Sequence, residues 1–215
     1  MIQRILLFIK LRVLSILPER AKYFLRGIKL LFVKPMIGAP SIPQDLLNDA
    51  KLISNRNIML EHLPKAAVVA EIGVLHGNYS HEIITRTMPK EFHLIDVDFS
   101  TLREDVSAHP SVIKHEKFSN IAMATFPDDY FDWIYVDGDH SYEGVKSDIR
   151  ACIPKLKTGG YLVFNDFCRI NLNGLGVFGV QLAVTELIVE QKWPLKFFAF
   201  ESGALYDVAV QKPYI

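Results

Sequence analysis

The pattern at Glu71-Ile-Gly73-Val-Leu-His-Gly77 predicts a strand that turns directly into a helix. An apolar run, 67–72, precedes Gly73, and a helical pattern follows over residues 80–87. Glycines at such a turn let the backbone pass close to a ligand, and the first turn of the helix offers free N–H groups. A simple tight turn would leave the same pattern, so the loop alone does not establish a ligand site.

Strand and helix patterns alternate from residue 66 to the end of the chain. Further strands are predicted over 92–97, 112–115, 133–136 and 161–164, with helices over 142–156 and 177–190. The pair Gly159-Gly160 is interpreted as the stop of the helix before it, and Ser202-Gly203 as the turn of a hairpin joining 196–201 to 204–211. Right-handed crossovers would place helices on both faces, so we expect an α/β, doubly wound, mostly parallel seven-stranded sheet, Rossmann-like, with an antiparallel C-terminal hairpin.

The residues before this body differ from it in charge. Residues 1–34 carry eight basic side chains and one acid, Glu19, which leaves 16 basic and 23 acidic residues in 35–215 although the net charge is zero. Two helical segments separated at Pro18 are predicted here, followed by a Pro- and Gly-rich linker over 34–44 and one or two short helices over 41–63. We therefore divide the chain into a basic amphipathic helical arm and linker, 1–60, and a ligand-binding domain, 61–215.

Composition excludes several classes of protein. Half of the residues are apolar and 22% are charged, which excludes a disordered chain, and the acidic body would repel nucleic acid. Cys152 and Cys168 have no metal-ligand spacing, so a reducing, cytoplasmic compartment is expected. Basic residues interrupt the N-terminal apolar stretch, so neither a membrane span nor a secretory signal is predicted.

The arm is expected to pack on the body, on a twin subunit in a homodimer, or peripherally on a membrane surface.

Acidic side chains follow the predicted strands. Asp96 ends the second strand, where a carboxylate can take both hydroxyls of a ribose. Asp137 and His140 follow the fourth strand, and Asn165-Asp166 follows the fifth. If these strands are neighbours, Asp137 with Asn165 or Asp166 would provide hard oxygen ligands for Mg²⁺, while His140 would remove a proton from a substrate hydroxyl.

These motifs resemble the S-adenosylmethionine-dependent class I methyltransferases. The resemblance covers about residues 60–212 and rests on four motifs: Glu71-x-Gly73-x-x-x-Gly77, Asp96, Asp137-Gly-Asp-His140-x-Tyr and Gly159-Gly160-Tyr-x-x-x-Asn165-Asp166. The chain is most similar to the macrocin-type, metal-dependent branch, which methylates sugars and other small molecules. It implies that the loop Glu71 to Gly77, with Gly73, holds the amino-acid part of S-adenosylmethionine. It further implies that Asp96 holds the ribose, that Ser119 contacts the adenine and that Asp137 also borders the cofactor.

The same resemblance implies Asp137, Asn165 and Asp166 as ligands of Mg²⁺ and His140 as general base. The sugar enzymes usually have two acids where this chain has Asn165-Asp166, whereas catechol-type enzymes have an Asp-Asn pair. The expected activity is methylation of a hydroxyl on a small sugar-like or polyol acceptor. Two alternatives stay open at this point: an NAD-dependent oxidoreductase, and a non-catalytic or membrane-associated S-adenosylmethionine-binding protein.

Overall fold

The computed structural model describes residues 18, 21, 24, 38–171, 176–201, 203 and 205–214. The predicted helical arm over 1–34 and the start of the linker therefore lie, apart from three residues, outside the described part of the chain. Within that part, no helix is both long enough and apolar enough to cross a membrane.

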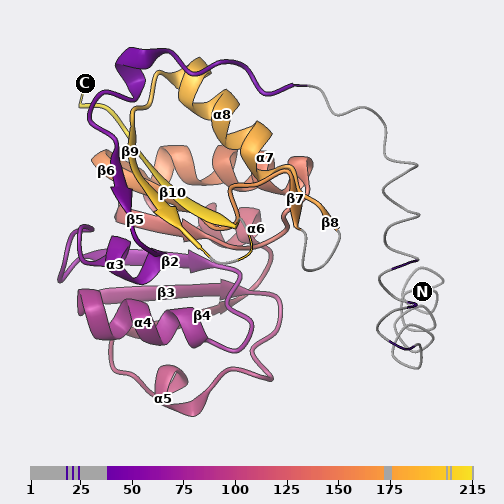
Figure 1. Ribbon diagram of the computed structural model, residues 1–215. Helices are drawn as coiled ribbons and strands as arrows, with labels where there is room; N and C mark the ends of the chain where they lie inside the picture. Colours follow the sequence, from indigo (N-terminus) through magenta and orange to yellow (C-terminus); the bar gives the residue numbers. More distant parts are fainter. Residues whose placement is uncertain are drawn as a thin grey trace.

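One mixed sheet forms the centre of the protein, with eight strands in the order β1-β9-β10-β6-β5-β2-β3-β4 (Figure 1). All neighbouring strands are parallel except β10, which runs antiparallel to both β6 and β9. The predicted C-terminal hairpin and the mostly parallel, doubly wound sheet are therefore confirmed. The strands are β1 (Lys51–Ile53), β2 (Val68–Ile72), β3 (Glu91–Asp96), β4 (Val112–Glu116), β5 (Phe131–Val136), β6 (Leu156–Phe164), β9 (Leu195–Phe200) and β10 (Tyr206–Gln211).

Helices cover both faces of the sheet. Their apolar residues fall into two buried clusters, one containing residues of α3, α4 and α5 and the other residues of α6, α7 and α8. Burial on both faces explains why β5 is a nearly continuous apolar run, Phe131 to Val136. The helices are η1 (Gln44–Leu46), α3 (Arg56–Leu60), α4 (Asn78–Thr87), α5 (Glu104–Ser107), α6 (Ser119–Met123), α7 (Tyr142–Cys152), η2 (Ile153–Lys155) and α8 (Val180–Gln191).

The structure corrects two local predictions. The segment 41–63 contains the short edge strand β1 between η1 and α3, which makes eight strands rather than seven. The pair Gly159-Gly160 is not a helix stop, because α7 and η2 end before it and both glycines lie inside β6, where the register with β5 shifts. Gly159 has φ +74°, and a side chain there would collide with the ring of Tyr214.

The sheet order creates a switch point between β2 and β5. From β2 the chain proceeds outward through β3 to β4, and then returns to the other side of β2 at β5 and β6. In such sheets ligands bind outside the carboxyl ends of the strands at this point. The small hairpin of β7 (Ile170–Asn171) and β8 (Gly176–Val177) lies at the same end of the sheet, on the right in Figure 1.

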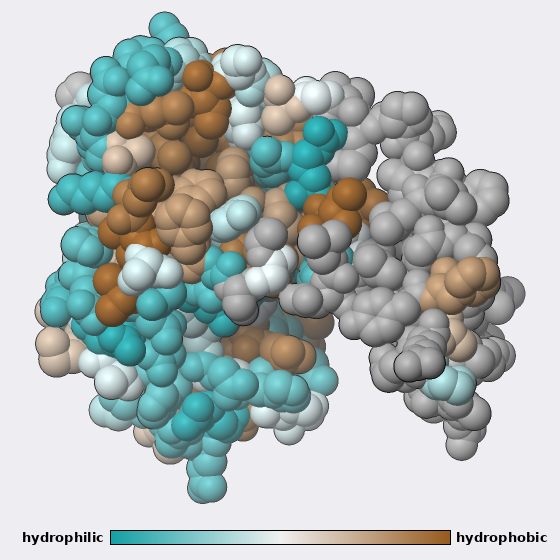
Figure 2. All heavy atoms as spheres, in the orientation of Figure 1, coloured by the Kyte–Doolittle hydropathy of each residue, from teal (hydrophilic) through white to brown (hydrophobic). Residues whose placement is uncertain are grey.

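The surface is unevenly polar. Figure 2 shows a mostly teal surface over α4 and α5, and brown and tan spheres on the side where β1, β9 and β10 lie. Leu52 on β1 and Phe200 on β9 are among the exposed large apolar residues, at 73% and 46% exposure. The edge of the sheet formed by β1 is therefore an apolar part of the surface.

Candidate active site

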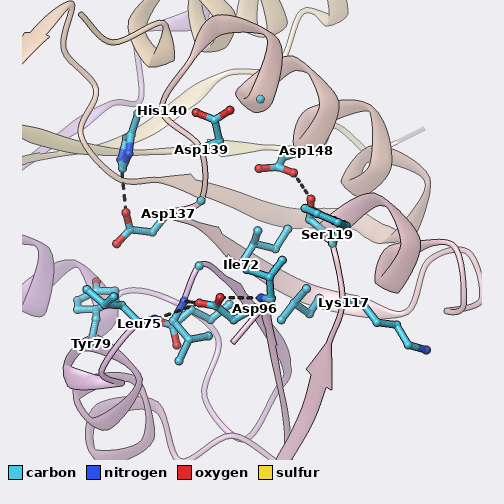
Figure 3. Close-up of a pocket in the computed structure, with 18 of the residues that line it drawn as sticks. Ile72, Leu75, Tyr79, Asp96, Lys117, Ser119, Asp137, Asp139, His140 and Asp148 are labelled. Carbon is cyan, nitrogen blue, oxygen red and sulfur yellow. Dashed lines mark hydrogen bonds and ion pairs between the residues drawn. The ribbon is translucent and has the colours of Figure 1, made fainter. Parts of the chain in front are cut away.

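A pocket of about 790 Å³ lies at the switch point (Figure 3). Six of the residues predicted for the site line it, and they come from the ends of β2, β3, β4 and β5: Glu71, Gly73, Asp96, Ser119, Asp137 and His140. Gly77, Asn165 and Asp166 are not part of its lining. The pocket has the size typical of small-molecule sites in proteins.

Gly73 brings the first loop against the end of β5. It has φ +82°, and a side chain there would collide with the backbone carbonyl of Asp137. The N–H of Asp137 donates to the carbonyl of Ile72 at 2.8 Å, which holds the two strand ends together. Gly77, with φ +73°, is the N-cap residue of α4 and packs against Leu102, so its role is to shape the turn.

Glu71 is a buried carboxyl at the base of the pocket, 1% exposed. Burial raises its pKa to about 8, and the charges of Asp137 and Asp96 act in the same direction. Two groups lower the pKa: the hydroxyl of Ser80, which donates to Oε2 at 2.5 Å, and the charge of Arg56. The carboxyl is therefore mostly protonated at neutral pH and can both donate and accept a hydrogen bond.

Asp96 joins the first loop to the loop after β3. Its Oδ2 accepts hydrogen bonds from the N–H groups of Val74 (2.7 Å) and Leu75 (3.1 Å), and its Oδ1 accepts from Val97 (2.6 Å) and Asp98 (3.2 Å). Four donors use the lone pairs of the carboxylate. Hydroxyls of a bound ribose would therefore share these oxygens with the backbone.

Ser119, the first residue of α6, has a partner that the sequence did not indicate. Its hydroxyl donates to Oδ1 of Asp148, a residue of α7 that is 4% exposed. Burial raises the pKa of Asp148 to about 6, although the Ser119 hydrogen bond lowers it. Both side chains line the pocket (Figure 3), where they can accept a hydrogen bond from a ligand amino group.

His140 lies among three oxygen atoms that the sequence predicted to meet. Its Nε2 is 3.3 Å from Oδ1 of Asn165, 3.4 Å from Oδ1 of Asp137 and 3.7 Å from Oδ2 of Asp166. Burial lowers the pKa of His140, but the Asp137 hydrogen bond and the charges of Asp137 and Asp166 outweigh burial and raise it. The ring of Phe178 stacks on the imidazole with centroids 4.5 Å apart.

Asn165 is oriented by buried groups behind it. Its Nδ2 donates to the hydroxyl of Tyr135 and to Oδ1 of Asp207, both at 3.2 Å, which leaves Oδ1 toward His140. The Tyr135 hydroxyl in turn donates to Oδ2 of Asp207 at 2.7 Å. Burial raises the pKa of Asp207 to about 7. Asp207 lies in an otherwise apolar strand, and this buried acid is a sequence signal that could have marked it.

The donor set of Asp137, Asn165 and Asp166 suits Mg²⁺ in its chemistry, because all three offer oxygen atoms. These oxygens surround one point, yet in this conformation the point is taken by Nε2 of His140. Among the residues that the structure describes, no group of three or more His, Cys, Asp or Glu side chains is arranged to hold a metal ion. The residues would fit the ion only after the imidazole turns away.

Two other residues near the site take structural roles. Asp139 accepts hydrogen bonds from the N–H and hydroxyl of Ser141, at 2.9 and 2.8 Å, and so shapes the turn into α7. Cys168 is buried, and burial raises the pKa of its thiol to about 11. A thiol with this pKa is a packing residue rather than a nucleophile.

Comparison with known proteins gives one family match. Residues 70–167 match a family model described as a methyltransferase domain. This segment contains the candidate site residues from Glu71 to Asp166. Among curated proteins, no sequence matches the chain.

Solved structures share the fold at low sequence identity. N-methyltransferase NodS from Bradyrhizobium japonicum WM9, in complex with S-adenosyl-L-homocysteine, is 17% identical, with a TM-score of 0.56 over 74% of this chain and 86% of that one. A structural-genomics target from Corynebacterium glutamicum is 15% identical and covers 97% of both chains, with a TM-score of 0.57. An O-methyltransferase family protein from Burkholderia thailandensis is 13% identical, with a TM-score of 0.53 over 73% of this chain and 55% of that one.

The fold and the position of the pocket define a Rossmann-like chain with a pocket at the switch point of its sheet, where ligands bind in this architecture. Residues 70–167 match the methyltransferase-domain model, and the solved structures share the fold of this chain.

Proposed function

We propose that the protein transfers a methyl group from S-adenosylmethionine to a hydroxyl of a sugar-like or other polyol small molecule. The observation that carries this proposal is the position of His140 among Asp137, Asn165 and Asp166, beside the glycine loop. A proton acceptor and oxygen ligands next to the cofactor site suit transfer to a hydroxyl, which must lose its proton.

The pocket offers a partner for each part of the cofactor. Gly73 and Glu71 lie where the amino-acid part would bind, and Asp96 offers its carboxylate to the ribose. Ser119 and Asp148 would accept a hydrogen bond from the adenine amino group. Gly77 would act only through the shape of the loop, since it does not line the pocket.

The reaction needs alignment and one proton transfer. The acceptor oxygen forms a bond to the methyl carbon as the bond from sulfur to that carbon breaks, and the sulfonium becomes a neutral thioether. Because Nε2 of His140 faces three oxygen acceptors, the hydrogen of the neutral ring belongs on Nε2, and Nδ1 is left to take the hydroxyl proton. Asp137 and Asp166 would stabilise the imidazolium that forms. Holding the reactants in line can supply several kcal/mol, up to about 7–11 in favourable models.

We further propose that Asp137, Asn165 and Asp166 hold Mg²⁺ in a second arrangement of the site, in which the imidazole of His140 has turned away from their three oxygens. When bound, this ion would lower the pKa of the acceptor hydroxyl and orient a vicinal diol. The contribution of the chain is to fix these oxygens. Asp207 and Tyr135 hold the amide of Asn165, Asp137 follows directly after β5, and Asp166 is the second residue after β6.

Transfer of radiolabelled methyl groups to a panel of sugars and phenols tests this function. Asp137→Ala should abolish transfer and the calorimetric Mg²⁺ signal, while S-adenosylmethionine affinity stays within about threefold. His140→Gln should lower turnover about 10²- to 10⁴-fold. Glu143→Gln, in the exposed first turn of α7, serves as the control and should behave like the unmodified protein. Full activity of Asp137→Ala would refute the assignment.

A further inference from the structure

Arg56 is a cation of the candidate site for which the proposed reaction gives no role. It is the first residue of α3 and lies outside residues 70–167, so the family match does not include it. Its side chain lines the pocket of about 790 Å³ together with Glu71, Gly73 and Tyr79. Its charge is close enough to Glu71 to lower the pKa of that carboxyl. Arg56 therefore lies at the end of the pocket proposed for the amino-acid part of the cofactor.

The guanidinium of Arg56 is held in place without an ion pair. It lies over the ring of Tyr79, 4.6 Å from the ring centroid, and its Nη1 donates to the hydroxyl of Tyr135 at 3.4 Å. Tyr79 is itself fixed, because its hydroxyl donates to the carbonyl of Arg56 at 3.2 Å and its ring packs against that of Tyr135. Among the described residues, no carboxylate forms an ion pair with this guanidinium. A half-buried cation whose N–H groups are mostly unused favours an anionic ligand.

The acids around Arg56 have other hydrogen-bond partners. Oδ2 of Asp207 accepts from the hydroxyl of Tyr135 at 2.7 Å, and Oε1 of Glu201 accepts from the backbone N–H of Arg56 at 2.9 Å. Glu71 is mostly protonated at neutral pH, because burial raises its pKa to about 8. A ligand carboxylate beside Arg56 would therefore meet little negative charge from Glu71, and the guanidinium is left to bind it.

The rest of the pocket is strongly acidic. Its lining contains five carboxyl groups: Glu71, Asp96, Asp137, Asp139 and Asp148. Lys117 is the other lysine or arginine of the lining, but it is exposed, lies beside Phe118 and Ser119, and extends away from the labelled acids in Figure 3. S-adenosylmethionine carries a sulfonium and an ammonium group, which suit the acids, and one carboxylate, which does not. Arg56 is the cation at the end of the pocket where that carboxylate would lie.

We infer that Arg56 binds the carboxylate of S-adenosylmethionine and thereby selects this cofactor against its decarboxylated form. The inference rests on the proposed function, since it takes S-adenosylmethionine as the ligand of the pocket. A planar guanidinium can donate two parallel hydrogen bonds to a carboxylate, which gives direction as well as affinity. The decarboxylated form keeps both positive groups and would place its amine near Arg56 without a negative charge between them. Arg56 is thus a specificity-determining residue for the cofactor.

Titration calorimetry of the full chain with S-adenosylhomocysteine and with its decarboxylated analogue tests the inference without turnover. The two ligands share the adenosine, the thioether and the amine, and they differ only in the carboxylate. The unmodified protein should bind S-adenosylhomocysteine at least tenfold more tightly than the analogue. Arg56→Gln should weaken binding of S-adenosylhomocysteine about ten- to a hundredfold, as expected for lost charge-assisted hydrogen bonds, and should leave the Kd of the analogue within about threefold.

Two further variants separate the charge of Arg56 from its shape. Arg56→Lys keeps the positive charge but loses the planar pair of donors, so it should recover part of the preference for S-adenosylhomocysteine. Arg86→Gln is the matched control, because Arg86 is not part of the pocket lining and is paired with Glu82 at 2.8 Å and Glu61 at 2.9 Å. Its affinities for both ligands should equal those of the unmodified protein.

Three results would overturn the inference while leaving the proposed function intact. The first is equal affinity of the unmodified protein for the two ligands, and the second is unchanged binding of S-adenosylhomocysteine by Arg56→Gln. The third is equal weakening of both ligands in Arg56→Gln, because Arg56 would then only shape the pocket. Failure of the unmodified protein to bind either ligand would instead contradict the proposed function, and this inference with it.

Discussion

Oδ2 of Asp96 accepts a hydrogen bond from the N–H of Val74 at 2.7 Å. The carboxylate proposed to hold the ribose therefore also holds the glycine loop in place. On the proposed binding mode, cofactor affinity and loop conformation would be coupled through this one side chain, since both would depend on the same two oxygens.

Asp96→Asn should weaken binding of S-adenosylmethionine at least tenfold. The amide would turn an N–H toward a backbone N–H and would lose charge-assisted hydrogen bonds, which contribute about 1.5–3 kcal/mol each. Titration calorimetry measures the change. Asp98→Asn is the matched control, because Asp98 is exposed and, among the described residues, its carboxylate accepts hydrogen bonds only from Ser100. Equal affinities of the two variants would contradict the role given to Asp96.

Gly73→Ala should destabilise the fold and remove cofactor binding. The positive φ alone costs on the order of 1–3 kcal/mol, and the added methyl group would collide with the Asp137 carbonyl. Thermal unfolding with and without S-adenosylmethionine would show both effects. Gly38→Ala should leave both quantities unchanged, because within the described part of the chain no heavy atom beyond its two neighbours lies within 4 Å of the added group. A Gly73→Ala protein as stable as the original would exclude this close approach.

Asp207→Asn should lower kcat about tenfold or more and leave the Kd for S-adenosylmethionine within about twofold. Asp207 accepts from Tyr135 and Asn165, and an amide at this buried position cannot accept at both of its atoms. The Asn165 oxygen would lose its fixed direction. Steady-state kinetics and calorimetry separate the two quantities. A raised Kd with unchanged kcat would assign Asp207 to the cofactor rather than to the orientation of Asn165.

The free energy of unfolding should fall as the pH drops below about 6.5. Burial lowers the pKa of His93 from 6.5, and the charge of His115 lowers it further, although the carboxylate of Glu91 acts in the opposite direction. Burial also lowers the pKa of His115, and the charge of Lys117 adds to this effect. The unfolded chain therefore binds protons more readily than the folded chain in this range.

Urea unfolding at several pH values checks this dependence. His93 is 4% exposed, and the Tyr130 ring lies against its imidazole. Nδ1 of His93 is 3.0 Å from Nε2 of His115, and its Nε2 is 3.5 Å from the carboxylate of Glu91. His93→Phe removes one of the titrating groups and should therefore reduce the slope of the unfolding free energy with pH. The new ring should be tolerated, because Phe126 and Phe131 already surround this position. A slope that persists unchanged in this variant would mean that another group controls it.

The sequence predicted the parts of the fold that have a local cause. β2, β3 and β5 are apolar runs ending in glycine or acid, so their position and the meeting of Asp137, His140 and Asn165 followed from pattern and topology. β1 could not be predicted, because it has three residues, only Ile53 of which is buried.

The contacts made across the sheet could not be predicted from sequence either. Asp207 reaches Asn165 only because β10 pairs with β6 in one register. Arg56 reaches Tyr135 only because α3, which packs beside α4 and β9, shares a buried cluster with Tyr135. Asp148 meets Ser119 through the packing of α7 on α6. Such pairs are far apart in the chain, and no periodicity reports them.

Titration calorimetry of the full-length protein with S-adenosylmethionine and with NAD⁺ tests the central assignment most directly. The loop from Glu71 to Gly77 and the carboxylate of Asp96 would suit either ligand in outline. We predict that S-adenosylmethionine and S-adenosylhomocysteine bind at one site per chain, that Asp96→Asn weakens both, and that NAD⁺ gives no binding heat. Binding of NAD⁺ without binding of S-adenosylmethionine would contradict the account.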